Sequence, residues 1–229
     1  MSSRTILLAF LGACAAAACA AAAYAADWST FVAASNRADD GLILDILKDA
    51  DFQTSREICL AIGSRSDPYA GDILSWLLAG FSRTGEYKTE HLIRLALASL
   101  FDPAQSDQQL RSRLDANAAV VSDLVRGIDG FGDPQLRGLI VRLLPRLGEP
   151  DRLSVLMRVG DGILDRLRQT GGILSPPDTG LALDYLDVVL EIGNADFMEP
   201  CLSISRLSRD QAVVQKARQA SLLLASRPR

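Results

Sequence analysis

The amino-acid sequence predicts an all-α fold, and three observations support that prediction. Apolar residues recur at spacings of three, four and seven residues, and no segment sustains an alternation of apolar and polar residues. The apolar stretches are too long for strands and are rich in Leu, Ala and Arg. Asp-Pro pairs precede two of them, as expected at helix starts, because Asp caps a helix and Pro suits its first turn.

The composition limits the classes of function. Apolar residues make up 48% of the 229 residues, enough to bury a core and too many for a disordered chain. With 24 basic against 28 acidic residues and no polybasic block, the sequence predicts no nucleic-acid partner. One histidine and four cysteines leave little room for a metal cluster or a disulfide framework. Cys59 and Cys201 lie in apolar runs, where we expect buried thiols.

The first 25 residues have the pattern of a secretory signal peptide. Arg4 supplies a positive charge, residues 5–23 carry none, and the stretch ends in the small-x-small motif Ala23-Tyr24-Ala25. Its alanine-rich second half is too weakly apolar for a transmembrane anchor. We therefore predict cleavage after Ala25 and export to the periplasm.

The N-terminal segment also fits a second processing pathway, that of a lipoprotein. Leu11-Gly12-Ala13-Cys14 resembles the lipobox of bacterial lipoproteins, in which the cysteine is diacylated and becomes the new N-terminus. Cys14 would then carry a lipid that anchors the protein to the envelope membrane, the one membrane contact that the sequence suggests. Because the apolar core before this motif is short and Gly12 is a less usual residue at its position, cleavage after Ala25 is the preferred prediction.

The chain after the signal peptide divides into a predicted cap over residues 26–37, a helical domain over residues 38–226 and a tail over residues 227–229. Asp67-Pro68 and Asp133-Pro134 begin helices, and Gly148 ends one just before Pro150. The domain is predicted to contain five helix pairs: 38–49 with 53–63, 67–83 with 87–101, 107–129 with 133–147, 151–168 with 178–192, and 196–207 with 210–226. Two stretches depart from simple pairs, because residues 107–132 are long for one first helix and residues 171–177 interrupt the fourth pair.

The ends of the second helices indicate a repeat. Gly63, Phe101, Gly148 and Gly193 stand at these ends, 38, 47 and 45 residues apart, and the residues one, four and five positions before each are all apolar. Two-helix repeats have periods of about 40–47 residues. The interval and the shared ending together predict an array of helical hairpins.

The second helix of the last pair carries a family pattern. It follows the motif D-x-x-V-x-x-K/R-A-x-x-A-x-x-L with Asp210, Val213, Lys216, Ala217, Ala220 and Leu223. In this respect the chain resembles the HEAT-repeat family. The resemblance implies a right-handed α-solenoid of about five helical hairpins, each hiding its apolar stripe against its neighbours. An irregular α-helical bundle of the same helices is the alternative.

The sequence predicts no catalytic residue, no cofactor and no metal site. His91 is the only imidazole, and the adjacent Glu90 points elsewhere on the helix, so we expect a histidine on a helix surface. Asp184 and Asp187 share a helix face, where we expect solvated carboxylates rather than an acid/base pair. These two carboxylates are nevertheless the basis of an alternative function, a helical hydrolase or lyase domain.

The preferred function is a non-catalytic, exported module or scaffold that binds another protein of the bacterial cell envelope. Second helices of HEAT-like arrays line an inner face, and such faces bind proteins or peptides. A polar face of mixed charge would steer a complementary partner into register. The residues predicted to contact this partner are charged and lie off the apolar stripes of the second helices: Arg56, Glu57, Arg94, Arg142, Arg146, Asp187 and Glu191.

Overall fold

The computed structural model describes residues 51–61, 69–101, 106–147 and 151–226, and these parts of the chain contain helices and no strand. The all-α prediction is therefore confirmed for them. The predicted signal peptide, Cys14, the cap over residues 26–37, the helix over residues 38–49 and the tail lie outside the described residues.

The helices lie close to their predicted positions. The α-helices are α3 (Phe52–Ala61), α4 (Tyr69–Thr84), α5 (Tyr87–Leu100), α6 (Asp107–Ala116), α7 (Ala118–Arg126), α8 (Pro134–Leu143), α9 (Asp151–Gln169), α10 (Pro176–Ile192), α11 (Met198–Leu207) and α12 (Gln211–Ala225). Among the described residues, short 3₁₀ helices join them: η2 (Ile128–Gly130), η3 (Leu144–Arg146) and η4 (Ala195–Phe197).

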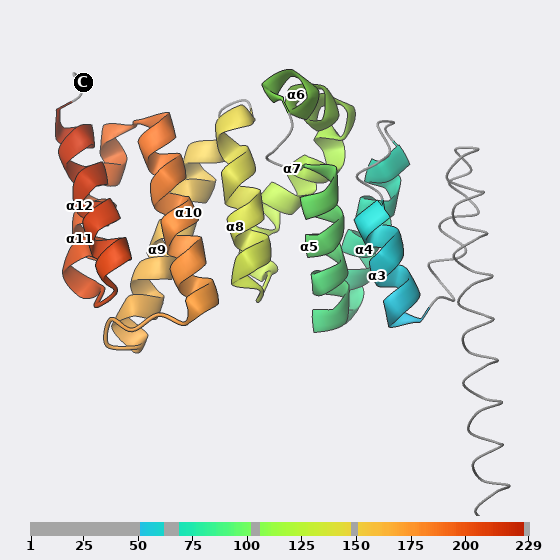
Figure 1. Cartoon of the computed structure of the whole chain (residues 1–229), viewed down its shortest axis with the longest axis horizontal. Coiled ribbons are helices and arrows are strands. Elements are labelled where there is room, and N and C mark those ends of the chain that lie inside the picture. Colours follow the sequence, from blue (N-terminus) through green and yellow to red (C-terminus); the bar gives the residue numbers. More distant parts are fainter. Residues whose placement is uncertain (1–50, 62–68, 102–105, 148–150, 227–229) are drawn as a thin grey trace, which may run out of the picture.

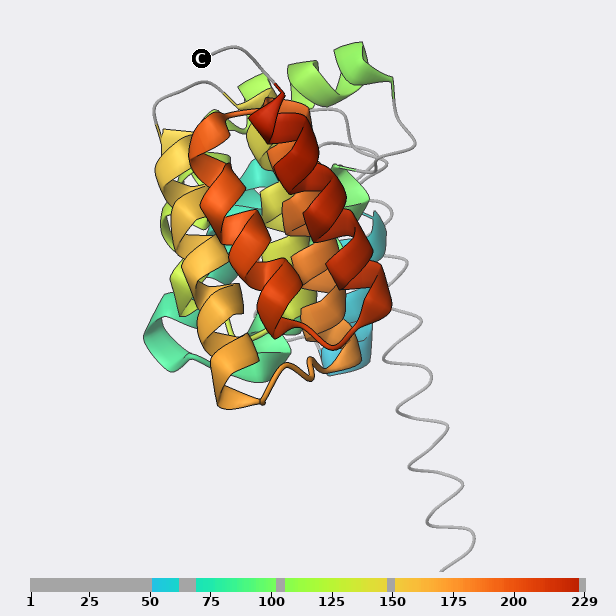
Figure 2. The same ribbon diagram turned by 90° about the vertical axis from the view of Figure 1, so that its left-hand side faces the viewer.

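The helices are arranged in two rows (Figure 1). One row runs α3, α5, α8, α10, α12, and each helix packs against the next. In the other row α4 packs against α7, η2 against α9, and α9 against α11. The rows are joined where α4 meets α5, α9 meets α10, and α11 meets α12, and Figure 2 shows the last of these pairs nearest the viewer.

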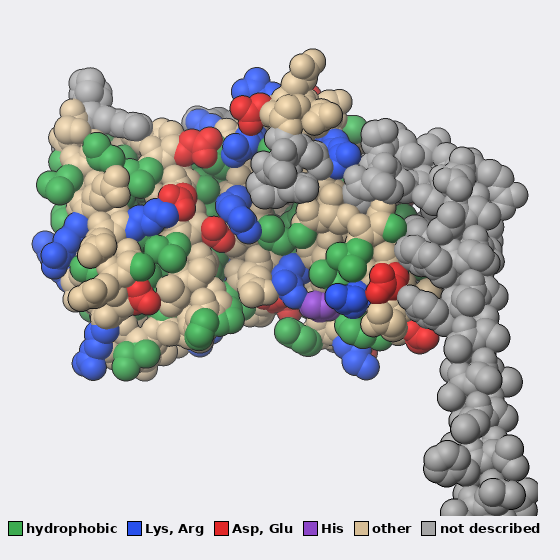
Figure 3. All heavy atoms as spheres, viewed as in Figure 1, with side chains coloured by type: hydrophobic (Ala, Val, Ile, Leu, Met, Phe, Trp, Pro, Cys, Tyr) green, Lys and Arg blue, Asp and Glu red, His purple; other side chains and the backbone are tan. Residues whose placement is uncertain are grey.

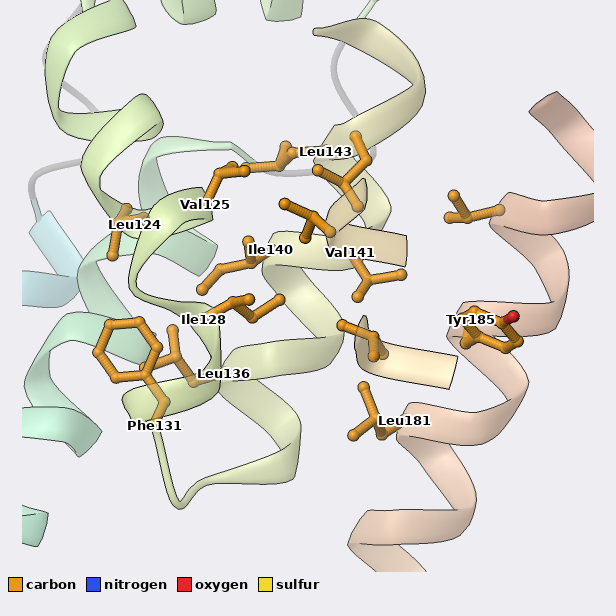
Figure 4. Packing of buried hydrophobic residues seen from close by; sticks show 14 of the residues in the cluster. Leu124, Val125, Ile128, Phe131, Leu136, Ile140, Val141, Leu143, Leu181 and Tyr185 are labelled. Carbon is orange, nitrogen blue, oxygen red and sulfur yellow. The ribbon is translucent and has the colours of Figure 1, made fainter. Parts of the chain in front are cut away.

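One apolar core runs between the two rows. It includes side chains of α7, α8 and α10, among them Leu124, Ile140 and Tyr185, which are at most 1% exposed. Figure 4 shows how these side chains fill the space between the helices. Burying a Leu or Ile side chain contributes about 1.5–3 kcal/mol. Packing between neighbouring helices therefore stabilises the whole length of the array.

The long helix predicted over residues 107–129 is wrong, because Asn117 divides it into α6 and α7. The side-chain amide of Asn117 donates to the carbonyl of Arg113 at 2.8 Å and satisfies a carbonyl at the end of α6. Its Oδ1 lies against Gly71 of α4, where a methyl group would come within 2.1 Å of that oxygen. Asn117 thus caps the end of α6, and the missing side chain of Gly71 leaves room for Asn117 against α4.

Two prolines shift predicted helix boundaries. Pro145 falls inside the predicted helix 133–147, where α8 changes to the 3₁₀ helix η3. A proline has no N–H to continue the α-helical hydrogen bonds. Pro176 opens α10 two residues before the predicted start, with Ser175 as the N-cap. Its fixed backbone angle suits that position, so the prolines of the predicted interruption belong to the helix.

The cysteines are buried thiols, as predicted. Cys59 of α3 and Cys201 of α11 are both free and fully buried. Burial raises the pKa of each thiol to about 12. Thiolate is the reactive form of cysteine, so both side chains act as small apolar groups.

Candidate binding face

The seven residues predicted to contact a partner all come from the row α3, α5, α8, α10. Arg56 and Glu57 lie on α3, Arg94 on α5, Arg142 on α8, Arg146 on η3, and Asp187 and Glu191 on α10. We call the side of this row seen in Figure 3 the front face. Figure 3 shows acidic and basic side chains distributed across it, with hydrophobic side chains between them.

Most of these charges pair with a neighbouring helix. Arg142 Nε lies 3.6 Å from Asp184 Oδ1, and Arg146 Nη1 lies 3.8 Å from Glu191 Oε1. Lys216 of α12 donates to Asp187 Oδ2 at 2.5 Å. Because each pair has at least one exposed partner, it contributes only about 0–1 kcal/mol to stability. As a result, negative charges on α10 lie between positive charges on α8 and α12.

A tighter polar cluster joins α5 to α8. Arg94 Nε forms an ion pair with Asp133 Oδ2 at 2.9 Å, and its Nη1 donates to Gln135 Oε1 at 2.7 Å. Asp133 caps α8, because its Oδ1 accepts from the Gln135 backbone N–H. Glu90 is 4% exposed, and its Oε1 accepts from the Asp133 backbone N–H at 2.6 Å.

Sequence reasoning missed the role of Glu90. It placed Glu90 away from His91, which is correct, but the carboxylate reaches α8 instead of solvent. This partner is 43 residues away in the chain, so no local pattern indicates it. The Asp133-Pro134 helix start was the only signal in this region, and the structure confirms that cap.

His91 lies at the edge of this cluster and is partly buried, rather than on an open helix surface. Its Nδ1 lies 2.8 Å from Arg94 Nη2, and its ring centroid lies 5.9 Å from that of Phe52. Burial and then the Arg94 charge lower the pKa of His91. Both favour the neutral imidazole, which can accept the hydrogen bond from Arg94.

Two hollows adjoin on the front face. The first, of about 220 Å³, lies between α5, α8 and α10, with an apolar floor and a charged rim. Its rim is formed by Asp107, Arg142, Arg146, Asp187 and Glu191, and its floor by Leu97, Phe101, Leu110, Leu139, Leu143 and Val188. The second, of about 320 Å³, includes Arg94, Pro176, Pro177 and Asp184. Leu139 and Arg142 line both, so the hollows form one groove over α8, the α8 groove.

The two carboxylates of the predicted alternative site face different hollows. Asp187 lines the first hollow and pairs with Lys216, whereas Asp184 lines the second and pairs with Arg142. Burial raises the pKa of Asp184, and Arg142 opposes that shift. Each carboxylate thus has its own cation and its own surroundings.

Within the part of the chain that the structure describes, no three or more His, Cys, Asp or Glu side chains are grouped so that they could hold a metal ion. No described helix combines the length and apolar character needed to cross a membrane. The chain matches no model of a known protein family, no curated protein and no solved structure.

Proposed function

We propose that this protein is a non-catalytic interaction module, a right-handed α-solenoid of HEAT-like hairpins that binds a protein partner in the α8 groove. The α8 groove carries the proposal, because α5, α8 and α10, three successive helices of one row, build it together with the first turns of α6. Solenoids bind partners along surfaces that consecutive repeats create together. Five of the seven residues predicted from the sequence line this groove: Arg94, Arg142, Arg146, Asp187 and Glu191.

The α8 groove suits an extended segment of a partner. Neighbouring helices pack with axes about 8–10 Å apart, so α5 to α10 spans about 20 Å. That length corresponds to about six residues of extended chain at about 3.3 Å each. Apolar side chains of the partner would contact Leu97, Leu139 and Leu143, and its charged side chains would meet the rim. Rim charges mainly set register and association rate, and buried apolar contacts supply most of the affinity.

We place the module in the bacterial cell envelope, on the basis of the signal-peptide pattern in residues 1–25. Cleavage after Ala25 gives a periplasmic protein, and lipidation at Cys14 gives one anchored to the envelope membrane. The intact mass of the protein from soluble and membrane fractions tests this: a chain beginning at Ala26 supports periplasmic export, and a diacylated Cys14 supports the anchored form.

Site-specific photo-crosslinking tests the proposed groove. A photoreactive amino acid at Leu139, on the groove floor, is expected to capture a discrete envelope protein identifiable by mass spectrometry. Met157 on α9 is the matched control, because its side chain is 38% exposed and α9 belongs to the other row. Capture at Leu139 that Arg142→Glu with Arg146→Glu abolishes supports the proposal. Equal capture at both positions, or capture indifferent to charge reversal, contradicts it.

One observation favours the alternative of a hydrolase or lyase. Asp184 has a raised pKa and lines a hollow, as a general acid does. Its ion pair with Arg142, and the separate pairing of Asp187, argue for a structural role. A hydrolytic activity in the purified protein that Asp184→Asn abolishes would establish the enzyme instead of the module.

A further inference from the structure

A third hollow, of about 210 Å³, lies between α8, α9 and α10 and borders the α8 groove at Leu181. We call it the Arg137 pocket, because Arg137 of α8 is the residue that distinguishes it. Its polar lining is formed by Arg137, Asp165, Arg166, Gln169 and Asp178.

The guanidinium of Arg137 has no partner in the part of the chain that the structure describes. Its Nε is buried and finds no hydrogen-bond acceptor, and no described carboxylate forms an ion pair with it. The neighbouring acids are engaged elsewhere: Asp129 with Arg158 at 2.7 Å, Asp165 with Arg168 at 2.8 Å, and Asp178 with Arg166 at 4.0 Å. The pocket lining thus carries two positive and two negative charges, and none of these carboxylates accepts a hydrogen bond from Arg137 Nε.

A buried guanidinium N–H without an acceptor is costly, and Arg137 Nε is such a group. Arginine stays protonated in proteins, so its charge must be solvated or paired. Burial is the largest influence on Arg137 and lowers its pKa, and the Arg166 charge acts in the same direction. Asp129 and Asp178 offset part of this through space. A carboxylate bound in the pocket would supply the acceptor that Arg137 Nε lacks.

The backbone of α9 makes room for this arginine. At Gly162 a methyl group would lie 3.3 Å from Arg137 Nη2, so a glycine there lets the guanidinium lie close to the helix. The guanidinium is thereby held at the pocket wall, where its planar set of N–H donors is available to a ligand.

We propose that the Arg137 pocket binds a carboxylate group. The planar N–H donors of arginine match two carboxylate oxygens. A phosphate dianion carries twice the negative charge of a carboxylate, so Asp165 and Asp178 in the same pocket would repel it more strongly. The carboxylate can belong to a small organic acid or to the C-terminus of a protein chain. The Arg137 pocket borders the α8 groove at Leu181, but the charged residues that define the two sites are different, so either assignment can fail without the other.

Acetate is the probe, and the side-chain Nε–H resonance of Arg137 in the ¹⁵N-labelled whole protein is the readout. Titration with sodium acetate against sodium chloride at constant ionic strength is expected to shift this resonance saturably. Arg137→Gln should lower acetate affinity about tenfold or more, measured on other resonances of the pocket such as Gln169. Arg158→Gln is the matched control, since it removes an exposed arginine from the pair with Asp129 and does not line the pocket.

Two further arms define the ligand. Inorganic phosphate at the same concentration should bind more weakly than acetate. Short peptides with a free or an amidated C-terminus then distinguish a protein C-terminus from a small organic acid as the ligand. A protein C-terminus is supported if the free-acid peptide binds more tightly than acetate and the amidated peptide does not bind. A small organic acid is supported if acetate binds more tightly than either peptide. A linear, unsaturable shift, equal binding by Arg137→Gln, or a preference for phosphate would overturn the proposal.

Discussion

The backbone N–H of Arg209, before α12, donates a hydrogen bond of 2.8 Å to the carbonyl of Gly172 in the turn between α9 and α10. Gly172 has a φ of +90°, and its own N–H donates to Leu167 to close α9. Residues 171–177, which the sequence indicated as an interruption, therefore contain a turn that bonds to the segment between α11 and α12. Helical arrays gain stability from such contacts between neighbouring units.

Gly172→Ala is expected to lower the free energy of unfolding by about 3 kcal/mol. A methyl group at this position would lie 2.2 Å from the Leu207 carbonyl oxygen, and the positive φ disfavours any side chain. Gly171→Ala is the matched control, because Gly171 also has a positive φ but no atom near its missing methyl group. That variant should lose only about 1 kcal/mol. Urea denaturation measures both, and equal losses would show that the contact with Leu207 is unimportant.

The sequence predicted the helices well because their information is local. Apolar spacing, Asp-Pro starts and glycine ends lie within single helices, and the structure places α5, α8, α10 and α12 close to the predicted ranges. The break at Asn117 was missed because the apolar spacing continues through it, and the burial of Asn117 against Gly71 of α4 depends on a residue distant in the chain. Pattern alone does not reveal that contact.

The residues of the candidate site were predicted only in part, because only some of the information about them is local. Helical spacing identified charged residues off the apolar stripes, and several of them line the α8 groove. Spacing could not show that Arg142 pairs with Asp184, or that Arg137 has no partner, because both depend on how separate helices pack. Adjacent elements are predictable from sequence, whereas the pairing of charges between them requires the structure.

Glu90→Ala is expected to lower the free energy of unfolding by about 1–3 kcal/mol, because the buried N–H of Asp133 loses its acceptor. Glu90→Gln retains an acceptor oxygen and should lower the free energy of unfolding much less. Thermal denaturation of the two variants measures the difference. If both lose the same stability, the negative charge of Glu90, and not its hydrogen bond, is the important feature.

Tyr185→Phe is expected to leave the free energy of unfolding unchanged or to raise it by up to about 1 kcal/mol. Tyr185 is fully buried, and its hydroxyl finds no hydrogen-bond partner among the described residues. Removing that oxygen therefore removes a desolvated polar atom without breaking a bond. Gly160→Ala provides the contrast, because its methyl group would lie 2.6 Å from the hydroxyl oxygen and 3.0 Å from the ring carbon Cζ. It should lose about 1–3 kcal/mol by overpacking. A large loss in Tyr185→Phe would reveal a partner for the hydroxyl.

Ionisation of Asp184 is expected to weaken the fold as the pH rises. Burial is the main cause that raises the pKa of Asp184 above the ordinary value of 3.8, with Asp187 adding to the shift and Arg142 opposing it. Between 3.8 and the higher folded-state pKa, the folded protein keeps a proton that the unfolded chain has released. The contribution of Asp184 to the free energy of unfolding therefore falls across that interval and is constant above it.

Asp184→Asn should remove this fall, so its stability relative to the original protein should rise with pH across the same interval. The lost ion pair with Arg142 reduces the gain only slightly, because the Arg142 side chain is 47% exposed. Arg142→Gln is the companion variant, and it should raise the pKa of Asp184 further because it removes the opposing charge. Carboxyl ¹³C titration by NMR measures the pKa directly, and urea denaturation over the same pH range measures stability. An Asp184 that titrates at or below 3.8, or an Asn variant whose stability parallels that of the original protein at every pH, would contradict this account.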